Sequence, residues 1–316
     1  MTPSGLDSAA AVGKSRGALA GNRRRTVIRM TTDTIRLALP KGRMQDGVFA
    51  LLAEAGIDVQ LGGRDYRPRL SLPGFEAKLL KPQNVVEMLH MGSRDLGFAG
   101  ADWVAELDAE LVEVLDTGLD PVRVVAAAAR GVLVDGVLRS GPLVVASEYE
   151  RLARAWIADK ALEATFVRSY GATEAFPPDD ADCIVDNTAT GATLEQNGLV
   201  IVDELLASST RLYVNPQMLD DASKREQMER LAMLLGSVLA ARKRVMVEVN
   251  VSAANLEAVI DALPCMREPT IAPLRGNTGF AVKAAVPRES LPRVIPEIKA
   301  RGGTDVVVSA LAQIVP

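Results

Sequence analysis

Short apolar runs alternate with amphipathic helical patterns along most of the chain. The run Ile35–Leu39 is followed by apolar residues at helical spacing up to Gly56, which predicts a strand and then a helix. A second strand is predicted over 75–81 with a helix after it, and the segment 95–102 predicts a third strand that closes on two glycines and an acid. Strands and helices in this order indicate an α/β protein.

The middle of the chain repeats this pattern. Strands are predicted at 143–146 and 164–167, with a helix over 149–160 between them. A long amphipathic helix over 222–242 follows. Its Met and Leu residues recur at helical spacing, which indicates packing against a core rather than a binding site.

The last part of the chain has a different pattern. Four valines between Val245 and Val251 alternate with other residues, as in a strand with one buried face. A helix, two strands, a second helix and a final strand are predicted after it. The order βαββαβ is the ferredoxin-like arrangement, which commonly serves as a small regulatory or interaction module.

These patterns divide the chain into four segments. We predict a disordered tail over 1–33, a first lobe over 34–122 and 211–242, a second lobe over 123–210, and a separate ferredoxin-like domain over 243–316. The tail is rich in Ala, Gly and Ser and contains the basic cluster Arg23–Arg25. A transit peptide, or a true start at Met30, would also account for it.

The composition argues against several classes of protein. The net charge of -4 argues against nucleic-acid binding, which usually needs a basic face. No apolar run approaches the roughly 20 residues that span a bilayer, and no secretory signal is evident, so we expect a cytoplasmic protein. The two cysteines have no metal-binding spacing and are expected to be free and buried. A small-molecule partner is therefore favoured.

The most informative segment is 182–199. Asp182 and Asp186 bracket an apolar run, and threonines around Gly191 follow at once. Carboxylates accept hydrogen bonds from a ribose diol, while hydroxyls and backbone N–H groups at a helix start hold phosphate. Asn197 and the glycine after it supply a helix stop. The segment therefore predicts a clamp for a sugar phosphate.

Two other segments carry candidate polar chemistry. Lys41 and Arg43 follow the first strand, where loops of open α/β sheets face ligands, although a solvated basic turn would have the same pattern. Asp102 follows the third strand, where it would cap the next helix or face a ligand. The only histidine, His90, falls late in a helix, which favours a structural role.

Taken together, these segments resemble the long form of the ATP phosphoribosyltransferase family, the first enzyme of histidine biosynthesis. The resemblance covers nearly all of the chain after residue 33 and is carried, in the family's order, by Leu39–Arg43, Asp95–Asp102, Asp182–Leu199 and the Leu263–Ile271 region. It implies a bilobal core similar to periplasmic binding proteins, followed by a C-terminal ferredoxin-like regulatory domain.

The resemblance also implies a reaction. The phosphoribosyl group of phosphoribosyl pyrophosphate passes to N1 of the adenine of ATP, with inversion at the anomeric carbon and release of pyrophosphate. Positive charge grows on the ribose and negative charge on the leaving pyrophosphate, so the site must hold both. The family depends on Mg²⁺, whose ligands the sequence does not identify. No residue is needed as a general base, because adenine N1 carries a lone pair.

Site residues follow by position against the family's motifs. Those implied to bind phosphoribosyl pyrophosphate are Glu174, Asp182, Asp186, Thr190, Gly191, Ala192, Thr193 and Leu194. Those implied to bind ATP or pyrophosphate are Lys41, Arg43, Lys81 and Asp102. Lys41 and Asp186 are the candidates for catalysis. Lys81 stands where relatives can carry arginine, so it keeps the charge but loses the bidentate geometry.

By the same resemblance, the C-terminal domain binds histidine as a feedback inhibitor and helps dimers assemble into hexamers. Asn250, Thr270 and Gly303 are the candidate contacts, although Asn250 and Thr270 would also suit bonding within a sheet. Asn250 stands where some relatives have an acid, so weaker inhibition is expected. Two other functions stay open, a solute-binding protein without catalysis and a nucleotide-salvage phosphoribosyltransferase.

Overall fold

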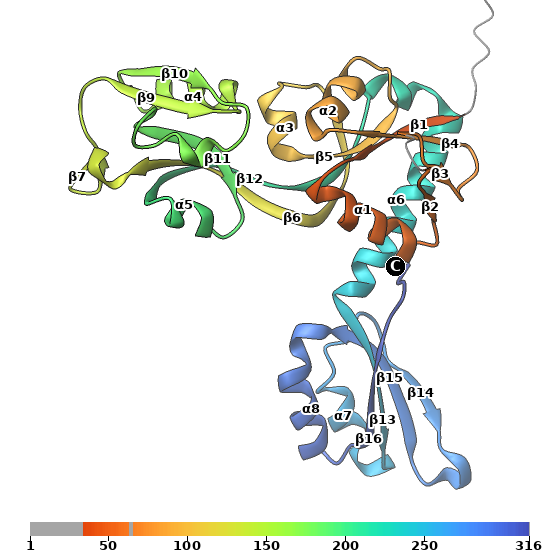
Figure 1. Cartoon of the computed structure of the whole chain (residues 1–316). Helices are drawn as coiled ribbons and strands as arrows, with labels where there is room; N and C mark the ends of the chain where they lie inside the picture. The colour runs from red at the N-terminus through yellow and green to blue at the C-terminus, as the bar shows by residue number, and fades with distance from the viewer. Residues whose placement is uncertain (1–33, 63–65, 316) are drawn as a thin grey trace, which may run out of the picture. The chain divides into compact units, whose positions relative to one another are not determined.

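The computed structural model describes residues 34–62 and 66–315 (Figure 1). The predicted tail over 1–33 lies outside the described residues. The described chain contains an eight-stranded mixed sheet and a separate four-stranded sheet. The strands of the large sheet are β1 (Ile35–Pro40), β4 (Phe75–Leu80), β5 (Leu96–Gly100), β6 (Val112–Ala129), β9 (Leu143–Ser147), β10 (Ala164–Arg168), β11 (Cys183–Thr188) and β12 (Leu199–Val214).

The first lobe surrounds β1, which pairs in parallel with β4 on one side and β5 on the other. Its helices are α1 (Arg43–Glu54), α2 (Pro82–His90), α3 (Ala101–Glu106) and α6 (Ala222–Arg242). The apolar face of α6 packs on the sheet, with Leu231 and Leu235 buried beside Phe98 of β5. Because burial of each such side chain stabilises by about 2 kcal/mol, this face fixes α6 in the lobe. The strands and helices predicted here are confirmed.

The two longest strands were only partly predicted. β6 and β12 have 18 and 16 residues, and they run side by side from β5 to β11 (Figure 1). From the sequence, only the bounds of the second lobe, at 122 and 210, were predicted in these segments. Polar residues and Pro121 interrupt the apolar alternation of β6, and the β6–β12 ladder contains several register shifts, which hide the strands from a period-two pattern. The lobe boundaries at 122 and 210 fall inside these strands.

The second lobe continues the same sheet in the order β10, β9, β11, β6. Its helices are α4 (Glu150–Asp159) and the short α5 (Ala192–Gln196). Val145, Ile184 and Cys183 are fully buried in its core. Both cysteines are free, as predicted, but only Cys183 is buried and Cys265 is half-buried. Burial raises the pKa of the Cys183 thiol to about 12, so it is a packing residue.

The C-terminal domain has the predicted βαββαβ order. Its elements are β13 (Arg244–Val251), α7 (Leu256–Ile260), β14 (Thr270–Pro273), β15 (Phe280–Pro287), α8 (Leu291–Ala300) and β16 (Thr304–Ala310). The strand order β14, β15, β13, β16 is antiparallel throughout, which is the ferredoxin-like sheet. The alternating valines of β13 are buried against the helices, as the period-two pattern predicts.

The remaining elements are short. They are the strands β2 (Val59–Gln60), β3 (Arg69–Leu70), β7 (Leu133–Val134) and β8 (Val137–Leu138), and the 3-10 turns η1 (Arg130–Val132), η2 (Thr173–Ala175), η3 (Pro216–Asp220), η4 (Ala253–Asn255), η5 (Arg275–Asn277) and η6 (Arg288–Ser290). Within the described ranges, no helix has the length and apolar character needed to cross a bilayer.

Candidate functional site

A cavity of about 310 Å³ is lined by residues of both lobes. The carboxyl ends of the parallel strands β1 and β5 meet at it, as expected for a ligand site in an open α/β sheet. Asn187 at the end of β11 and Ser208 of β12 contribute from the second lobe. The lining residues are Lys41, Arg43, Met44, Pro82, Gly100, Asp102, Trp103, Asp120, Val122, Asn187, Ser208, Ser209 and Thr210. The structure thus brings Lys41, Arg43 and Asp102 together.

The basic residues come from the turn between β1 and α1. Gly42 has φ of 79°, a backbone region that favours glycine, and it lets the chain reverse sharply between Lys41 and Arg43. The Lys41 ammonium lies 3.5 Å from the centre of the Tyr66 ring, a cation–π contact. Neither basic residue forms an ion pair with another described residue, so both charges are available to an anion.

Lys81 lies elsewhere. It is the N-cap residue of α2 and lines an adjacent cavity of about 340 Å³ together with Glu148 and Arg168. Trp103 lines both cavities. The structure does not bring Lys81 into the cavity that contains Lys41.

Asp102 is almost fully buried and faces the second lobe. Its carboxylate accepts hydrogen bonds from the Tyr149 hydroxyl at 2.6 Å and from Ser208 Oγ at 2.8 Å, and the Ser208 hydroxyl in turn accepts from the Asp102 backbone N–H at 3.0 Å. Asp102 is the second residue of α3, whose N-cap is Gly100, so it does not occupy the predicted capping position. Asp102 thus lines the cavity with its carboxylate already bonded to Tyr149 and Ser208, and its role toward a ligand stays a prediction.

Tyr149 is the main residue that sequence reasoning missed. It is 1% exposed, stacks on Trp103 with ring centroids 4.7 Å apart, and accepts a hydrogen bond from Asn187 Nδ2 at 2.9 Å while it donates to Asp102. Burial and the adjacent carboxylate raise the pKa of its hydroxyl far above the ordinary value, so it is a permanent donor. Asp102 and Asn187 are thus connected through a tyrosine distant from both in sequence.

Asp186 lies at the end of β11 beside this network. Its Oδ1 accepts from the Asn187 backbone N–H at 2.7 Å. Burial raises the pKa of the Asp186 carboxyl to about 6, against the lowering effect of that bond, and the charges of Glu174 and Glu148 raise it further. Glu174, in η2, is thus near enough to interact electrostatically with Asp186, as the two acids of one site would.

The threonine and glycine loop follows β11 directly. Gly191, with φ of 86°, is the N-cap residue of α5, and its N–H donates to Thr188 Oγ1 at 3.0 Å. Thr190 Oγ1 accepts from the Ala192 N–H at 3.3 Å. The predicted helix start and its stop at Asn197 are confirmed. First-turn N–H groups have no acceptor inside their own helix, which suits an anion here.

Two members of the predicted clamp have other positions. The side chain of Leu194 is buried in the core of the second lobe, so only its backbone faces the loop. Asp182 lies just before β11, about 13 Å from Asp186 by the rise of a strand. Its carboxylate accepts from the Val144 N–H at 2.8 Å and pairs with Arg139 at 3.1 Å. The structure thus separates Asp182 from the other candidates.

The inhibitor candidates lie in the C-terminal domain. Asn250 of β13 donates through Nδ2 to Asp305 Oδ2 at 3.1 Å. Thr270 is exposed on the edge strand β14, where it pairs with Lys283 rather than with Asn250. Gly303 is buried, and an added Cβ would meet the Ile298 side chain at 2.5 Å. The ladder thus places Asn250 next to Asp305, an acid that sequence reasoning missed.

The remaining titratable candidates are peripheral. His90 is exposed, and its Nδ1 accepts from the Glu110 N–H at 3.3 Å, consistent with the structural role predicted for it. Among the described residues, no three His, Cys, Asp or Glu side chains gather at a spacing that would hold a metal ion.

Comparisons with known proteins agree with this geometry. The family model HisG, described as ATP phosphoribosyltransferase, matches residues 81–237, and the model HisG, C-terminal domain matches residues 241–313. An ATP phosphoribosyltransferase of Pelotomaculum thermopropionicum is 33% identical over 89% of this chain and 99% of its own length. One of Chlorobium chlorochromatii is 35% identical over 85% of this chain and 93% of its own length.

A solved structure is also similar. The ATP phosphoribosyl transferase (HisG:HisZ) complex from Thermotoga maritima aligns with a TM-score of 0.59 and 26% identity, over 66% of this chain and 99% of that chain. The α/β bilobal core and the added C-terminal domain predicted from the sequence are thus confirmed.

Proposed function

Because the chain belongs to the ATP phosphoribosyltransferase family, we propose that the cleft between its lobes transfers the phosphoribosyl group of phosphoribosyl pyrophosphate to N1 of the adenine of ATP and releases pyrophosphate. One observation carries this proposal. Asp186 and the loop at Gly191 end one strand of the second lobe, and Asn187 between them lines the cavity that also contains Lys41, Arg43 and Asp102. These positions support a sugar-phosphate clamp beside a basic pocket.

The residues match the charges that the reaction develops. As the bond from the anomeric carbon to pyrophosphate breaks, positive charge grows on the ribose and negative charge on the leaving group. Lys41 and Arg43, which have no ion-pair partner among the described residues, stabilise the leaving pyrophosphate. Asp186 and Glu174 accept hydrogen bonds from the ribose hydroxyls and favour the cationic ring.

The phosphate end of the substrate occupies the loop before α5. Thr190, Thr193 and the N–H groups of the first turn bind the 5'-phosphate. Asp102 borders the pocket for adenine, where Tyr149 and Ser208 keep its carboxylate in one orientation. Catalysis is by positioning and electrostatics, so no residue acts as a general base.

In this proposal Mg²⁺ binds together with the phosphates of the substrate. The described residues offer no cluster of three metal-ligating side chains, but Mg²⁺ usually keeps several waters and binds through substrate phosphates with one or two carboxylates. Glu174 and Asp186 supply two such carboxylates. When bound, the ion neutralises charge on the departing pyrophosphate.

We also propose regulation and assembly. Histidine would bind in the C-terminal domain near Asn250 and Asp305 and inhibit, and copies of the chain would assemble as dimers and hexamers. The carboxylate of Asp305 beside the amide of Asn250 supports recognition of an ammonium group. ATP as a substrate favours a cytoplasmic location.

The experiment combines the purified chain, ATP, phosphoribosyl pyrophosphate, Mg²⁺ and a pyrophosphatase, and follows the adenine-substituted product. Product formation is expected with ATP. A solute-binding protein would form none, and a nucleotide-salvage enzyme would require a free base instead.

Two variants sharpen this test. Asp186→Ala together with Thr193→Val should reduce kcat/KM for phosphoribosyl pyrophosphate at least about 100-fold, because charge-assisted bonds to the diol and phosphate are lost. Glu163→Gln changes an exposed acid of the same lobe and should retain activity. Unchanged turnover in the double variant would contradict the assignment.

A further inference from the structure

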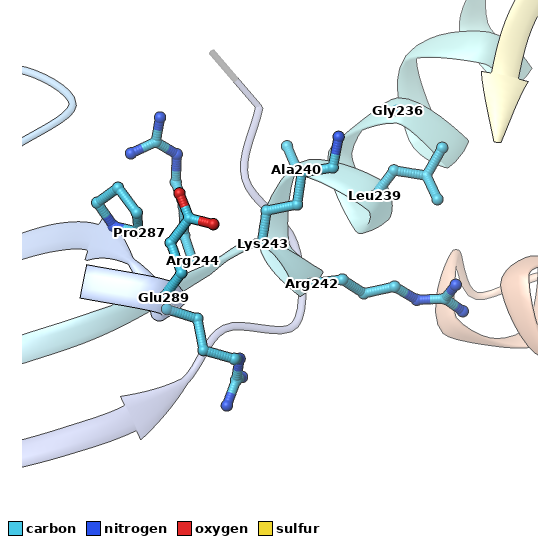
Figure 2. Close-up of a pocket in the computed structure, with 9 residues that line it drawn as sticks. Gly236, Leu239, Ala240, Arg242, Lys243, Arg244, Pro287 and Glu289 are labelled. Carbon is cyan, nitrogen blue, oxygen red and sulfur yellow. The ribbon is translucent and has the colours of Figure 1, made fainter. Parts of the chain in front are cut away.

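A second basic cavity, of about 780 Å³, lies at the junction between α6 and the C-terminal domain (Figure 2). One wall is the end of α6, with Leu239 and Ala240, and the other is the start of β13 with the turn after β15. Its charged side chains are Arg242, Lys243, Arg244, Arg288 and Glu289. Four cations therefore share this cavity with one carboxylate.

The fold itself gathers these cations. The Arg288 backbone N–H donates to the Lys243 carbonyl at 2.9 Å, and Arg244 is paired with Pro287 in the β13–β15 ladder. Arg288 is therefore held beside Lys243 and Arg244 although it lies more than forty residues later in the chain. Each pairing is set by backbone bonds, so the main chain keeps these three positions next to one another.

Part of this charge is already balanced. Arg242 forms a bidentate pair with Glu54, at 2.9 Å and 2.8 Å, and Lys243 follows the carboxyl end of α6, whose dipole favours cations. Arg244 and Arg288 are different, because neither side chain forms a hydrogen bond or ion pair with another residue in the described part of the chain. Two guanidinium groups thus have all of their donors available.

We propose that this junction cavity binds a multivalent phosphate-bearing anion, with Arg244 and Arg288 as its main ligands and Lys243 in support. Guanidinium groups match phosphate oxygens in bidentate geometry. Leu239, Ala240 and Pro287 provide an apolar wall for a small organic part. The bound anion would connect α6, whose apolar face is in the core of the first lobe, to the C-terminal sheet. The site does not depend on the proposed reaction.

The test is isothermal titration calorimetry of the full chain with inorganic tripolyphosphate, without Mg²⁺ and at fixed ionic strength. The background carries Lys41→Ala and Arg43→Ala, so that the cleft contributes little. We expect one site per chain, an affinity about tenfold or more weaker in Arg288→Ala and in Arg244→Ala, and partial recovery in Arg288→Lys.

The matched control is Arg293→Ala, which removes the same charge from an exposed position on α8 of the same domain. It should leave the affinity unchanged. Equal weakening in Arg293→Ala and Arg288→Ala would indicate nonspecific attraction and overturn the proposal, as would the absence of binding. Hydrogen exchange gives a second measurement, because tripolyphosphate should protect both the end of α6 and the turn after β15; protection of neither would also refute the site.

Discussion

At the scale of the residue, the most informative group is Asp186. Its pKa of about 6 arises first from burial and then from the charges of Glu174 and Glu148. A carboxylate is a better acceptor for ribose hydroxyls than a carboxylic acid, so the ionised form is the active one. Since the folded state raises this pKa, the ionised form predominates only above about pH 6.

We therefore predict an acidic limb in the pH profile of kcat/KM for phosphoribosyl pyrophosphate, with an apparent pKa of about 6. Activity should fall about tenfold per pH unit below it. Asp186→Asn should lower kcat/KM about 10- to 100-fold and remove this limb. A limb that persists in Asp186→Asn would show that another group titrates.

The same shift has a consequence for stability. The pKa of Asp186 in the folded state lies above that in the unfolded chain, so the stabilising contribution of this carboxyl is complete below about pH 4 and is lost as the pH rises through about 6. Asp186→Asn removes the buried charge. Urea unfolding at pH 7.5 should show the variant about 1–3 kcal/mol more stable than the parent, and the difference should vanish near pH 4.

At the scale of the element, β11 separates two acids of different roles. Asp182, just before β11, accepts from the Val144 N–H of β9 and pairs with Arg139, whereas Asp186 lies near the end of β11 and accepts from the Asn187 N–H. We predict that Asp182→Asn costs about 1–2 kcal/mol of stability in urea unfolding, because a partly exposed ion pair weakens. The KM for phosphoribosyl pyrophosphate should change less than about twofold. If Asp182→Asn raised this KM as much as Asp186→Asn does, Asp182 would have to contact the substrate after all.

A substitution at Gly191 tests the proposed phosphate-binding role of the loop before α5. A Cβ there would have room, since its nearest neighbour would be Ile201 Cδ1 at 3.7 Å, but φ of 86° disfavours any L side chain. Gly191→Ala should therefore cost about 1 kcal/mol and displace the first-turn N–H groups. We expect the KM for phosphoribosyl pyrophosphate to rise about tenfold while the KM for ATP stays nearly constant. Equal changes in both would indicate a general loss of structure.

The elements show what the sequence predicts and what it hides. β1, α1 and α6 were predictable because their apolar spacing is regular. The full lengths of β6 and β12 were not, since register shifts break their alternation. The loop at Gly191 was found because its residues are contiguous, but the Tyr149 bond to Asp102 spans 47 residues and leaves no local pattern. Only the folded sheet makes those two residues neighbours.

At the scale of the whole molecule, the C-terminal domain carries the proposed response to histidine. Its sheet is open on the face opposite the helices, where Asn250 contacts Asp305. An inhibitor's ammonium would meet one carboxylate and one amide there. Control of the distant cleft would then require that binding in this sheet changes the balance of conformations of the whole chain.

Asn250→Asp is the decisive variant for this idea. The variant has a second carboxylate beside that of Asp305. The two carboxylates repel each other in the free protein, and the ammonium group of a bound ligand relieves this repulsion. Histidine should therefore inhibit Asn250→Asp at concentrations about tenfold or more lower than the parent, with uninhibited kcat unchanged. Asp305→Asn should weaken inhibition instead. Glu248→Gln, an acid of the same strand that is paired with Lys283, is the matched control and should leave inhibition unaltered. An unchanged response in both Asn250→Asp and Asp305→Asn would place the inhibitor elsewhere, because a ligand held by this pair cannot be indifferent to its charge.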